Sequence, residues 1–503
     1  MAISVETFFL DPRSQATLQA QIQQMIAQGI LSGRFRRGEK LPSSRRLAQH
    51  LGVSRITVTL AYTELVASDY LCARGRSGYF VSDSAPEPMP VSSRPARSDA
   101  VDWGRAIGQQ FTGGAAPEKP TDWARYRYAF IYGQADPTLF DHANWRLCAL
   151  QALGQRDFAA MTTDYHDRDD PDLIEFIARQ ILPRRGIIAE HDEILVTLGA
   201  QNALWLTAQV LLTQRRTAVL EDPCYPALRD ILHQSRCHMV AVPVDGDGLP
   251  PDRVPDSADV IFTTPSHQCP TSATMPLERR HALLERARAL DALIVEDDYE
   301  FEMSFLRPPS PALKSLDQDG RVIYAGSFSK SLFPGLRLGY LVGAAPFIRE
   351  ARALRASVLR HPPGQMQRTT AYFLSLGHYD ALIARTTRAL AERRRVMEDA
   401  MQSHGLQVAG RGAHGGSSFW MQAPEGVETD TLATALRASG VLIEPGHAFF
   451  APGSAQRTFY RLAYSSIPAV RIPEGIARIA RAIAQAQSAG PVGAQPPPRL
   501  ALS

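Results

Sequence analysis

From about residue 125 to residue 487, short apolar runs alternate with longer stretches whose apolar residues recur at helical spacing. An apolar run bounded by turn residues is typical of a buried strand, and its alternation with helices is typical of an α/β domain. Ligands in an open α/β sheet bind beyond the carboxyl ends of the strands. The alternation therefore predicts a large α/β domain whose candidate site residues directly follow its strands.

The composition excludes several other classes of protein. Apolar residues make up 45% and charged residues 21% of the 503 residues, near the averages for globular proteins, so wholesale disorder is not expected. The five cysteines form no CxxC pair, which argues against a metal site and a disulfide framework. We find no signal-peptide pattern and no apolar stretch near 18 residues, so we expect a cytoplasmic chain without membrane contact.

A basic segment over residues 13–83 precedes the α/β region and is predicted to be a separate domain. The whole chain has a net charge of only +3, but nine basic residues oppose three acidic ones between Arg34 and Arg76, a net charge of +6 in 43 residues. Contacts with DNA phosphates need such a local density of positive charge. A small helical domain with a solvated basic face is the alternative interpretation.

The pattern within this segment indicates two helices and a hairpin. Ser43 or Ser44 can cap one helix, Gly52 can end it in a left-handed conformation, and Ser54 can cap a second helix. A glycine-rich hairpin follows, so the order is that of a winged helix-turn-helix.

The string LPSSRRLAQHLGVSRITVTLAYTEL closely resembles the GntR-type winged helix-turn-helix of bacterial transcription factors. The resemblance implies a double-stranded DNA operator, contacted by the start of the second helix and by the wing tip. The residues that it implies are Ser54, Arg55, Thr57 and Gly78, with Ser43 and Arg45 near phosphates.

The segment RVIYAGSFSKSLFPGLRLGYLVG carries the most specific chemistry. A strand should lead into a serine-rich loop that contains Lys330, and a second strand should leave it. A lysine in a desolvated pocket near other cations becomes neutral and can form an imine with an aldehyde. Ser327, Ser329 and Arg337 can bind a phosphate. An aldehyde that carries a phosphate and a basic ring is pyridoxal 5′-phosphate, whose ring nitrogen needs an acidic partner.

Other segments that follow strand-like runs supply further groups. Gly199-Ala200-Gln201 opens a helix whose backbone N–H groups can hold a phosphate, and Tyr225 can stack on a flat ring. The run Ala292–Val295 ends in acidic residues that include Asp297. If buried, these carboxylates need a partner, which is either a cationic ring nitrogen or a nearby arginine.

The region from 125 to 487 resembles the fold-type I aminotransferases. The resemblance implies that Lys330 joins the cofactor, that Asp297 pairs with its ring nitrogen, and that Tyr299 donates to its phenolic oxygen. Arg461, in FYRLAYS, matches the arginine that binds a substrate carboxylate. The resemblance also implies a stacking role for Tyr225 and phosphate contacts from Ser327, Ser329, Arg337, Gly199, Ala200 and Gln201.

One segment departs from that family. Many of these enzymes carry Asn-Pro-Thr-Gly where this chain has Cys269-Pro270-Thr271-Ser272. Cysteine is a weak substitute for the asparagine that hydrogen-bonds the phenolic oxygen, although His267 or Gln268 could fill that role. The departure leaves cofactor binding expected and puts efficient transamination in doubt.

The order of the segments resembles the MocR-like regulators: a DNA-binding domain, a proline-containing linker over 84–124, and an aminotransferase-like domain whose smaller part covers roughly 365–487. The tail over 488–503 should be disordered. The resemblance implies a transcription regulator that senses an amine, an amino acid or pyridoxal phosphate itself, and a head-to-tail homodimer. An active aminotransferase is the alternative function.

Overall fold

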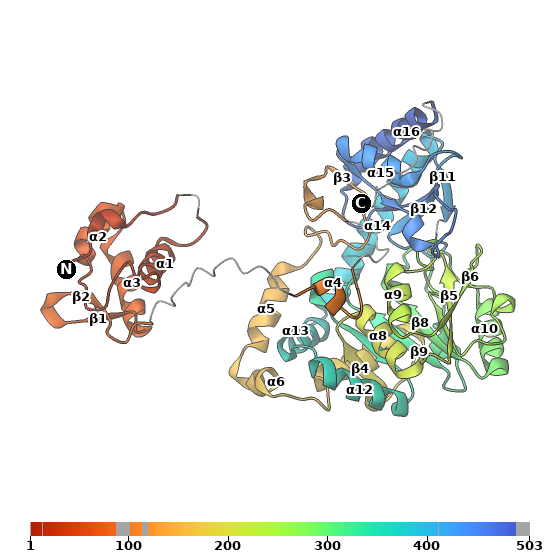
Figure 1. Cartoon of the computed structure of the whole chain (residues 1–503), viewed down its shortest axis with the longest axis horizontal. Helices are drawn as coiled ribbons and strands as arrows, with labels where there is room; N and C mark the ends of the chain where they lie inside the picture. The colour runs from red at the N-terminus through yellow and green to blue at the C-terminus, as the bar shows by residue number, and fades with distance from the viewer. Residues whose placement is uncertain (1, 13, 87–100, 113–118, 411, 489–503) are drawn as a thin grey trace. The chain divides into compact units, whose positions relative to one another are not determined.

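The chain divides into two units, Met1–Gln110 and Phe111–Ser503, in a computed structural model (Figure 1). The structure describes residues 2–12, 14–86, 101–112, 119–410 and 412–488. The expected linker falls partly outside these ranges, and its described part is divided between the two units. The expected disordered tail lies outside them except for Ser488. The predicted domain boundaries therefore stay predictions.

Within the described ranges, the first unit contains four α-helices and a two-stranded wing. The helices are α1 (Leu18–Leu31), α2 (Ser44–Leu51) and α3 (Arg55–Ala67), and a short α4 (Trp103–Ala106) lies further along the chain. The wing pairs β1 (Leu71–Ala73) with β2 (Tyr79–Val81) in antiparallel register. Gly52 ends α2 with a φ of +67°, in the left-handed region that glycine adopts without strain.

The core of this unit follows the helical spacing of its apolar residues. Ile22 and Ile26 on α1 and Val58 and Tyr62 on α3 are fully buried in one cluster. The Tyr62 hydroxyl donates 2.9 Å to the Pro42 carbonyl, which satisfies the one polar atom of that buried side chain. The buried face holds α3 so that its first two residues, Arg55 and Ile56, stay exposed.

The second unit contains a seven-stranded sheet in the order β4-β10-β9-β8-β7-β5-β6. Only β10 runs antiparallel to its neighbours. The bounds are β4 (Ile194–Thr197), β5 (Thr217–Asp222), β6 (His238–Pro243), β7 (Val260–Thr263), β8 (Leu293–Asp298), β9 (Val322–Ser327) and β10 (Gly339–Val342). The sheet confirms the predicted α/β fold, and β8 extends past the apolar run to include its acidic residues.

Helices cover both faces of this sheet. Neighbouring residues of β8 point to opposite faces: Ile294 packs with Leu283 of α10, and Val295 packs with Leu204 of α8. The helices of this part are α5 (His142–Ala152), α6 (Phe158–Thr162), α7 (Pro171–Phe176), α8 (Ala200–Leu211), α9 (Pro226–Gln234), α10 (Leu277–Leu290), α11 (Leu313–Leu316), α12 (Ala345–Leu359) and α13 (Gly364–Ser375). Burial on both faces explains why the strands are continuous apolar runs.

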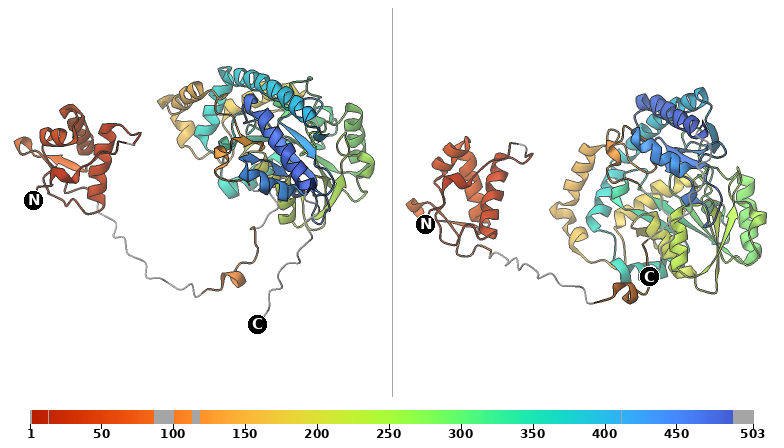
Figure 2. Two further views of the ribbon diagram at one scale, coloured as in Figure 1. Left: turned by 90° about the horizontal axis from the view of Figure 1, so that it is seen from above. Right: turned by 45° about the horizontal axis from the view of Figure 1, so that its top comes forward.

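A smaller antiparallel sheet completes the second unit, in the order β11-β12-β15-β14. Helices α14 and α16 pack against each other beside it (Figure 2). The bounds are β11 (Gln407–Gly410), β12 (Ser418–Gln422), β14 (Glu444–Pro445), β15 (Phe459–Ala463), α14 (His378–Ser403), α15 (Thr429–Ala438) and α16 (Ile472–Ser488). In addition, β3 (Tyr128–Ala129) pairs with β13 (Val441–Leu442), so the start of this unit joins its C-terminal part. Among the helices in the described ranges, none is both long and apolar enough to span a bilayer.

Candidate functional site

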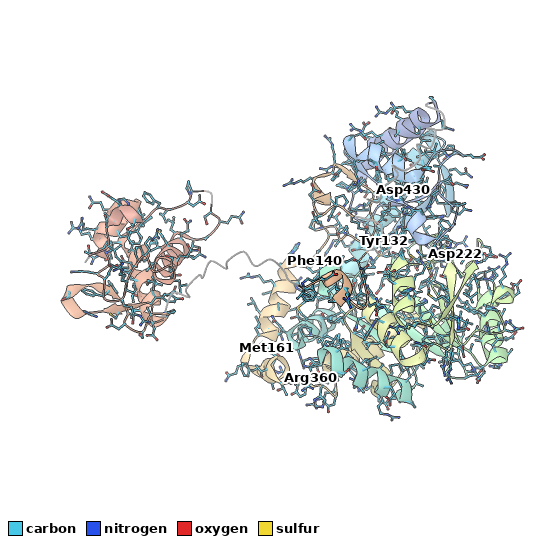
Figure 3. All side chains as sticks on the ribbon, in the orientation of Figure 1. Tyr132, Phe140, Met161, Asp222, Arg360 and Asp430 are labelled. Atoms are coloured by element: carbon cyan, nitrogen blue, oxygen red, sulfur yellow. The ribbon has the colours of Figure 1, made fainter. Side chains whose placement is uncertain are left out.

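A cavity of about 290 Å³ lies where β5, β8 and β9 end and the small sheet begins. Tyr132, one of its lining residues, is labelled at this junction in Figure 3. The cavity brings together nine of the ten sequence-predicted cofactor residues, and the tenth, Gly199, directly precedes the lining residue Ala200. The lining residues are Lys119, Tyr132, Ala200, Gln201, Tyr225, Pro226, Cys269, Asp297, Tyr299, Ser327, Ser329, Lys330, Arg337, Glu444, Phe449 and Arg461.

Lys330 follows β9 and reaches into this cavity. Its Nζ lies 4.2 Å from the centre of the Tyr132 ring. A Cβ added at Gly133 would stand 2.4 Å from the same nitrogen, so any other residue there would push the end of this lysine aside. Burial, with a further contribution from the charge of Lys119, lowers the pKa of Lys330 to about 8. Near neutral pH this amine is therefore neutral, and hence nucleophilic, in a much larger fraction than an ordinary lysine.

Asp297 is the uncommitted carboxylate at the end of β8. Its neighbour Asp298 pairs with Arg185 at 2.6 Å, and Glu296 accepts backbone hydrogen bonds from the start of α11. By contrast, Asp297 Oδ1 is buried without a hydrogen-bond partner in the described part of the chain. Burial, with the charges of Asp298 and Glu221, raises the pKa of Asp297 to about 7. The site thus offers an acceptor to a positively charged N–H group.

An anion-binding cradle forms another part of the cavity lining. Gly199 has a φ of +81° and precedes α8, whose first two residues, Ala200 and Gln201, line the cavity. A Cβ at this glycine would stand 3.6 Å from Arg337 Nη2 and 3.7 Å from Ser329 Oγ, so it would fill the space between them. Ser327 Oγ accepts from the Ser329 N–H at 3.1 Å and fixes the loop. These groups fit a phosphate.

The departing segment places a thiol at the cavity wall. Cys269 lines the cavity with Tyr225 and Tyr299, and burial raises the pKa of Cys269 to about 12. Gln268 does not line it, because its amide donates to Glu221 and to the Pro223 carbonyl at 3.1 and 2.7 Å. His267 is also buried outside the lining. The alternative that either side chain replaces asparagine is therefore wrong for this geometry.

Arg461 is buried and already paired. Its Nε donates 2.9 Å to Glu444 Oε2, and its guanidinium lies 4.1 Å from the centre of the Tyr132 ring. Burial works to lower the pKa of Arg461, but Glu444 and the other neighbours raise it overall, so the side chain stays charged. Lys119 Nζ lies 3.1 Å from the other oxygen of Glu444.

Sequence reasoning missed Lys119, Tyr132 and Glu444. Lys119 falls in the expected linker, and Glu444 is opposite Arg461 in the register of β14 and β15. A two-residue strand has no periodicity that a sequence pattern could detect.

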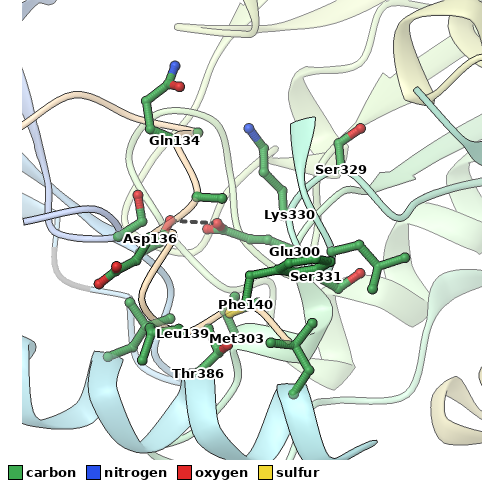
Figure 4. A pocket seen from close by; sticks show the side chains of 17 residues that line it. Gln134, Asp136, Leu139, Phe140, Glu300, Met303, Ser329, Lys330, Ser331 and Thr386 are labelled. Carbon is green, nitrogen blue, oxygen red and sulfur yellow. Dashed lines mark hydrogen bonds between the residues drawn. The ribbon is translucent and has the colours of Figure 1, made fainter. Parts of the chain in front are cut away.

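A second, smaller hollow adjoins the cavity at Lys330 (Figure 4). Lys330 and Ser329 line both spaces. In the close view the lysine extends away from Phe140 and Met303 at the apolar end of this hollow. Its polar wall contains Glu300, which accepts a hydrogen bond of 2.8 Å from Ser417.

The predicted DNA-contact residues surround the start of α3 and the wing of the first unit. Ser54 caps α3 through the Thr57 N–H at 3.1 Å, and Ser43 caps α2 through the Arg46 N–H at 3.3 Å. Arg45, Arg55 and Gly78 have the expected places on α2, at the first position of α3 and before β2. Ile56, which the sequence analysis passed over, is 71% exposed beside them. The two serine hydroxyls thus position the helix ends, while the arginines face solvent.

Comparison with known proteins agrees with both units. Residues 18–81 match the family described as "Bacterial regulatory proteins, gntR family", and residues 140–479 match "Aminotransferase class I and II". The chain is 60% identical over 483 residues to the HTH-type transcriptional regulator TauR of Rhodobacter capsulatus, covering 96% of this chain and all of that protein. It is 29% identical to the probable rhizopine catabolism regulatory protein MocR of Rhizobium meliloti, covering 96% and 97% of the two chains.

The second unit is also similar to solved aminotransferases. The α-aminoadipate aminotransferase LysN of Thermus thermophilus, solved with N-(5′-phosphopyridoxyl)-L-leucine, superimposes with a TM-score of 0.69 at 26% identity, covering 77% of this chain and all of that one.

Proposed function

We propose a function from the premise that this chain belongs to the MocR-like family of transcription regulators. Its second unit binds pyridoxal phosphate and an amine effector, and its first unit binds operator DNA. The uncommitted, buried Asp297 carboxylate supports the cofactor most directly, because a buried acceptor without a donor is costly in a protein that has no ligand for it. Lys330 and the anion cradle support the proposal further, because such a ligand needs an amine and a phosphate site.

Each cavity residue then has a defined task toward the cofactor. When bound, pyridoxal phosphate supplies an aldehyde that reacts with primary amines. Lys330 supplies the amine that joins it, Asp297 holds the proton on the ring nitrogen, and Tyr299 donates a hydrogen bond to the phenolic oxygen. Tyr225 stacks on the ring. The phosphate is held by Ser327, Ser329, Arg337 and the turn Gly199, Ala200 and Gln201.

The first unit binds the operator through α3 and the wing. Arg55 and Thr57 face the major groove, and Ser54 and Gly78 bring the backbone close to the DNA. Ser43 and Arg45, at the start of α2, contact phosphates. The local positive charge of this unit steers it toward DNA independently of the operator sequence.

The effector is an amine that competes with Lys330 for the cofactor, or pyridoxal phosphate itself. Arg461 favours an amine that carries a carboxylate or sulfonate, because a buried guanidinium binds such groups through two donors. A ligand shifts an equilibrium only by its different affinity for two states. An effector amine would take the place of the Lys330 amine at the aldehyde carbon of the bound cofactor, and the freed Lys330 side chain would supply such a difference.

The functional assembly is a homodimer in the cytoplasm, with the two chains arranged head to tail. An apolar strip on the second unit supports an interface with another copy: Leu147, Leu150 and Leu153 on and directly after α5 are 59%, 52% and 47% exposed, and the nearby Phe158 is 56% exposed. Contiguous exposed apolar side chains mark interaction surfaces. Light scattering at micromolar concentration measures the assembly, and a monomer would contradict this part of the proposal.

One experiment separates a regulator from a catalyst. The full chain, loaded with pyridoxal phosphate, is titrated with DNA from the region flanking its own gene at several salt concentrations, and the same sample is assayed with an amino donor and a keto acid. We expect tight, salt-sensitive binding of one fragment and no multiple turnover. Rapid turnover without fragment preference would favour an aminotransferase.

A further inference from the structure

The proposed function leaves one cation of the cavity without a task. The chain contains four lysines, and two of them, Lys119 and Lys330, line the same cavity. Lys330 serves the cofactor. The Lys119 ammonium donates 2.6 Å to the Tyr132 carbonyl and lies 3.1 Å from Glu444 Oε1. Its side chain is 32% exposed, so it retains access to the cavity.

Glu444 is shared by two cations. Besides Lys119 on one oxygen, it accepts 2.9 Å from Arg461 Nε and 3.1 Å from the Tyr132 N–H on the other. The carboxylate is buried, and its two neighbours Lys119 and Arg461 lower its pKa although burial acts to raise it. One ionised carboxylate therefore holds two positive charges at the same end of the cavity and cannot neutralise both.

The remaining lining does not cancel this excess. The cavity has four basic side chains and two carboxylates in its wall. Arg337 and Lys330 serve the phosphate and the aldehyde, and Asp297 serves the ring nitrogen. Glu300 lies outside the lining of this cavity, in the wall of the adjoining hollow, where it accepts hydrogen bonds of 2.8 Å from the Tyr132 hydroxyl and from Ser417.

We infer that Lys119, Tyr132, Glu444 and Arg461 form an acid pocket, in which Lys119 acts beside Arg461 as a second cation for the carboxylate or sulfonate of the effector. The inference rests on the proposed function. A single anion placed between the two cations gains two charge-assisted contacts, and Glu444 fixes their spacing. Amines without an acidic group gain neither contact, so the pocket selects amino acids and aminosulfonates over simple amines.

The test uses two stable compounds that differ only in the group that would meet the acid pocket. N-(5′-phosphopyridoxyl)-β-alanine carries a carboxylate where N-(5′-phosphopyridoxyl)propylamine carries a methyl group. Their affinities for the cofactor-free full chain are measured by calorimetry for wild type, Lys119→Met and Lys119→Arg. Lys314→Met is the matched control, because Lys314 lies on α11 outside the cavity lining.

We expect wild type to prefer the β-alanine compound. Lys119→Met should lower the affinity for that compound alone, roughly 10- to 100-fold, because it removes one hydrogen bond to a charged group. Lys119→Arg should restore most of the preference, and Lys314→Met should change nothing. If Lys119→Met kept the preference for the β-alanine compound unchanged, the inference would be overturned. Equal losses of affinity for both compounds would also overturn it, because they would mean that Lys119 has a purely structural role. If neither compound binds wild type, the proposed function itself fails. The sulfonate analogue shows which acid depends more strongly on Lys119.

Discussion

The two units place their charged residues in opposite environments. In the first unit, Arg45 and Arg55 project into solvent from helix ends that serine hydroxyls cap. In the second unit, Lys330 and Asp297 line a cavity, and burial lowers the pKa of Lys330 and raises the pKa of Asp297. Solvated charges are screened by salt, whereas desolvated charges change their protonation instead. The comparison teaches that DNA binding should respond mainly to salt and ligand binding mainly to pH.

The largest expected effect is the separation of the two functions by Lys330→Ala. Without its amine the cavity cannot hold the cofactor aldehyde, so the absorbance band of the lysine-bound cofactor and the response to effector should disappear. Affinity for operator DNA in the absence of effector should stay within about two-fold, because changes without a shared contact act independently. Absorbance spectra and DNA titrations measure both, and a persisting effector response would contradict the account.

Asp297→Asn should have the next largest effect, a lower affinity for the cofactor. The substitution keeps the shape of the side chain but removes the charge that pairs with the ring nitrogen. Because hydrogen bonds to charged groups contribute about 1.5–3 kcal/mol, we expect the affinity for pyridoxal phosphate to fall roughly 10- to 100-fold. Fluorescence titration measures it, with the exposed Asp247→Asn as control. Equal affinities for the two variants would assign Asp297 a structural role.

The pH dependence sharpens the comparison. Because the pKa of Lys330 is lowered to about 8, the neutral, reactive amine increases as pH rises through that value. The rate of cofactor capture should therefore increase from pH 7 to pH 9. Lys119→Met removes a neighbouring positive charge and should move the midpoint to higher pH. Stopped-flow absorbance measures the profile, and a flat profile would show that deprotonation of Lys330 does not limit capture.

Arg45→Ala should act on the other unit alone. Loss of one phosphate contact should weaken DNA binding uniformly across sequences and reduce the slope of log K against log salt by about 1. The cofactor spectrum should not change. Arg395→Ala, an exposed arginine of α14, is the control. A loss of specificity at one base pair, rather than uniform weakening, would assign Arg45 to a base instead.

The smallest expected effect concerns a helix cap. Ser54→Ala removes the acceptor of the Thr57 N–H at the start of α3 and should destabilise the first unit by about 1 kcal/mol. Its unfolding midpoint should fall by roughly 4–8 °C, as expected for a domain of about 60–100 residues. Ser68→Ala, at the C-terminal end of the same helix, is the comparison. Equal unfolding midpoints of the two variants in calorimetry would show that the Ser54 cap does not stabilise α3.

Local patterns allowed much of this structure to be predicted. The spacing of Val58, Ala61, Tyr62 and Leu65 identified the buried face of α3, since helical neighbours share a face. The apolar runs identified the sheet, and the residues that follow them identified most of the cavity. These features depend on neighbours within a few positions of the chain.

The acid pocket depends instead on contacts that no local pattern contains. The Tyr132 N–H meets Glu444 across 312 positions of the chain, and Glu444 meets Arg461 through the register of two short strands. Register is set by the packing of the whole sheet and not by a motif. Arg461 was therefore predicted from the family resemblance, whereas the other three residues of the pocket were missed.

The central claim is that Lys330 joins pyridoxal phosphate in a DNA-binding protein. The most direct test treats the loaded full chain with borohydride, which fixes the cofactor to its amine, and then maps all peptides by mass spectrometry. Only four lysines compete for the label: Lys40, Lys119, Lys314 and Lys330. We expect one labelled peptide, the one that contains SFSK. A label on another lysine, or on none, would contradict it.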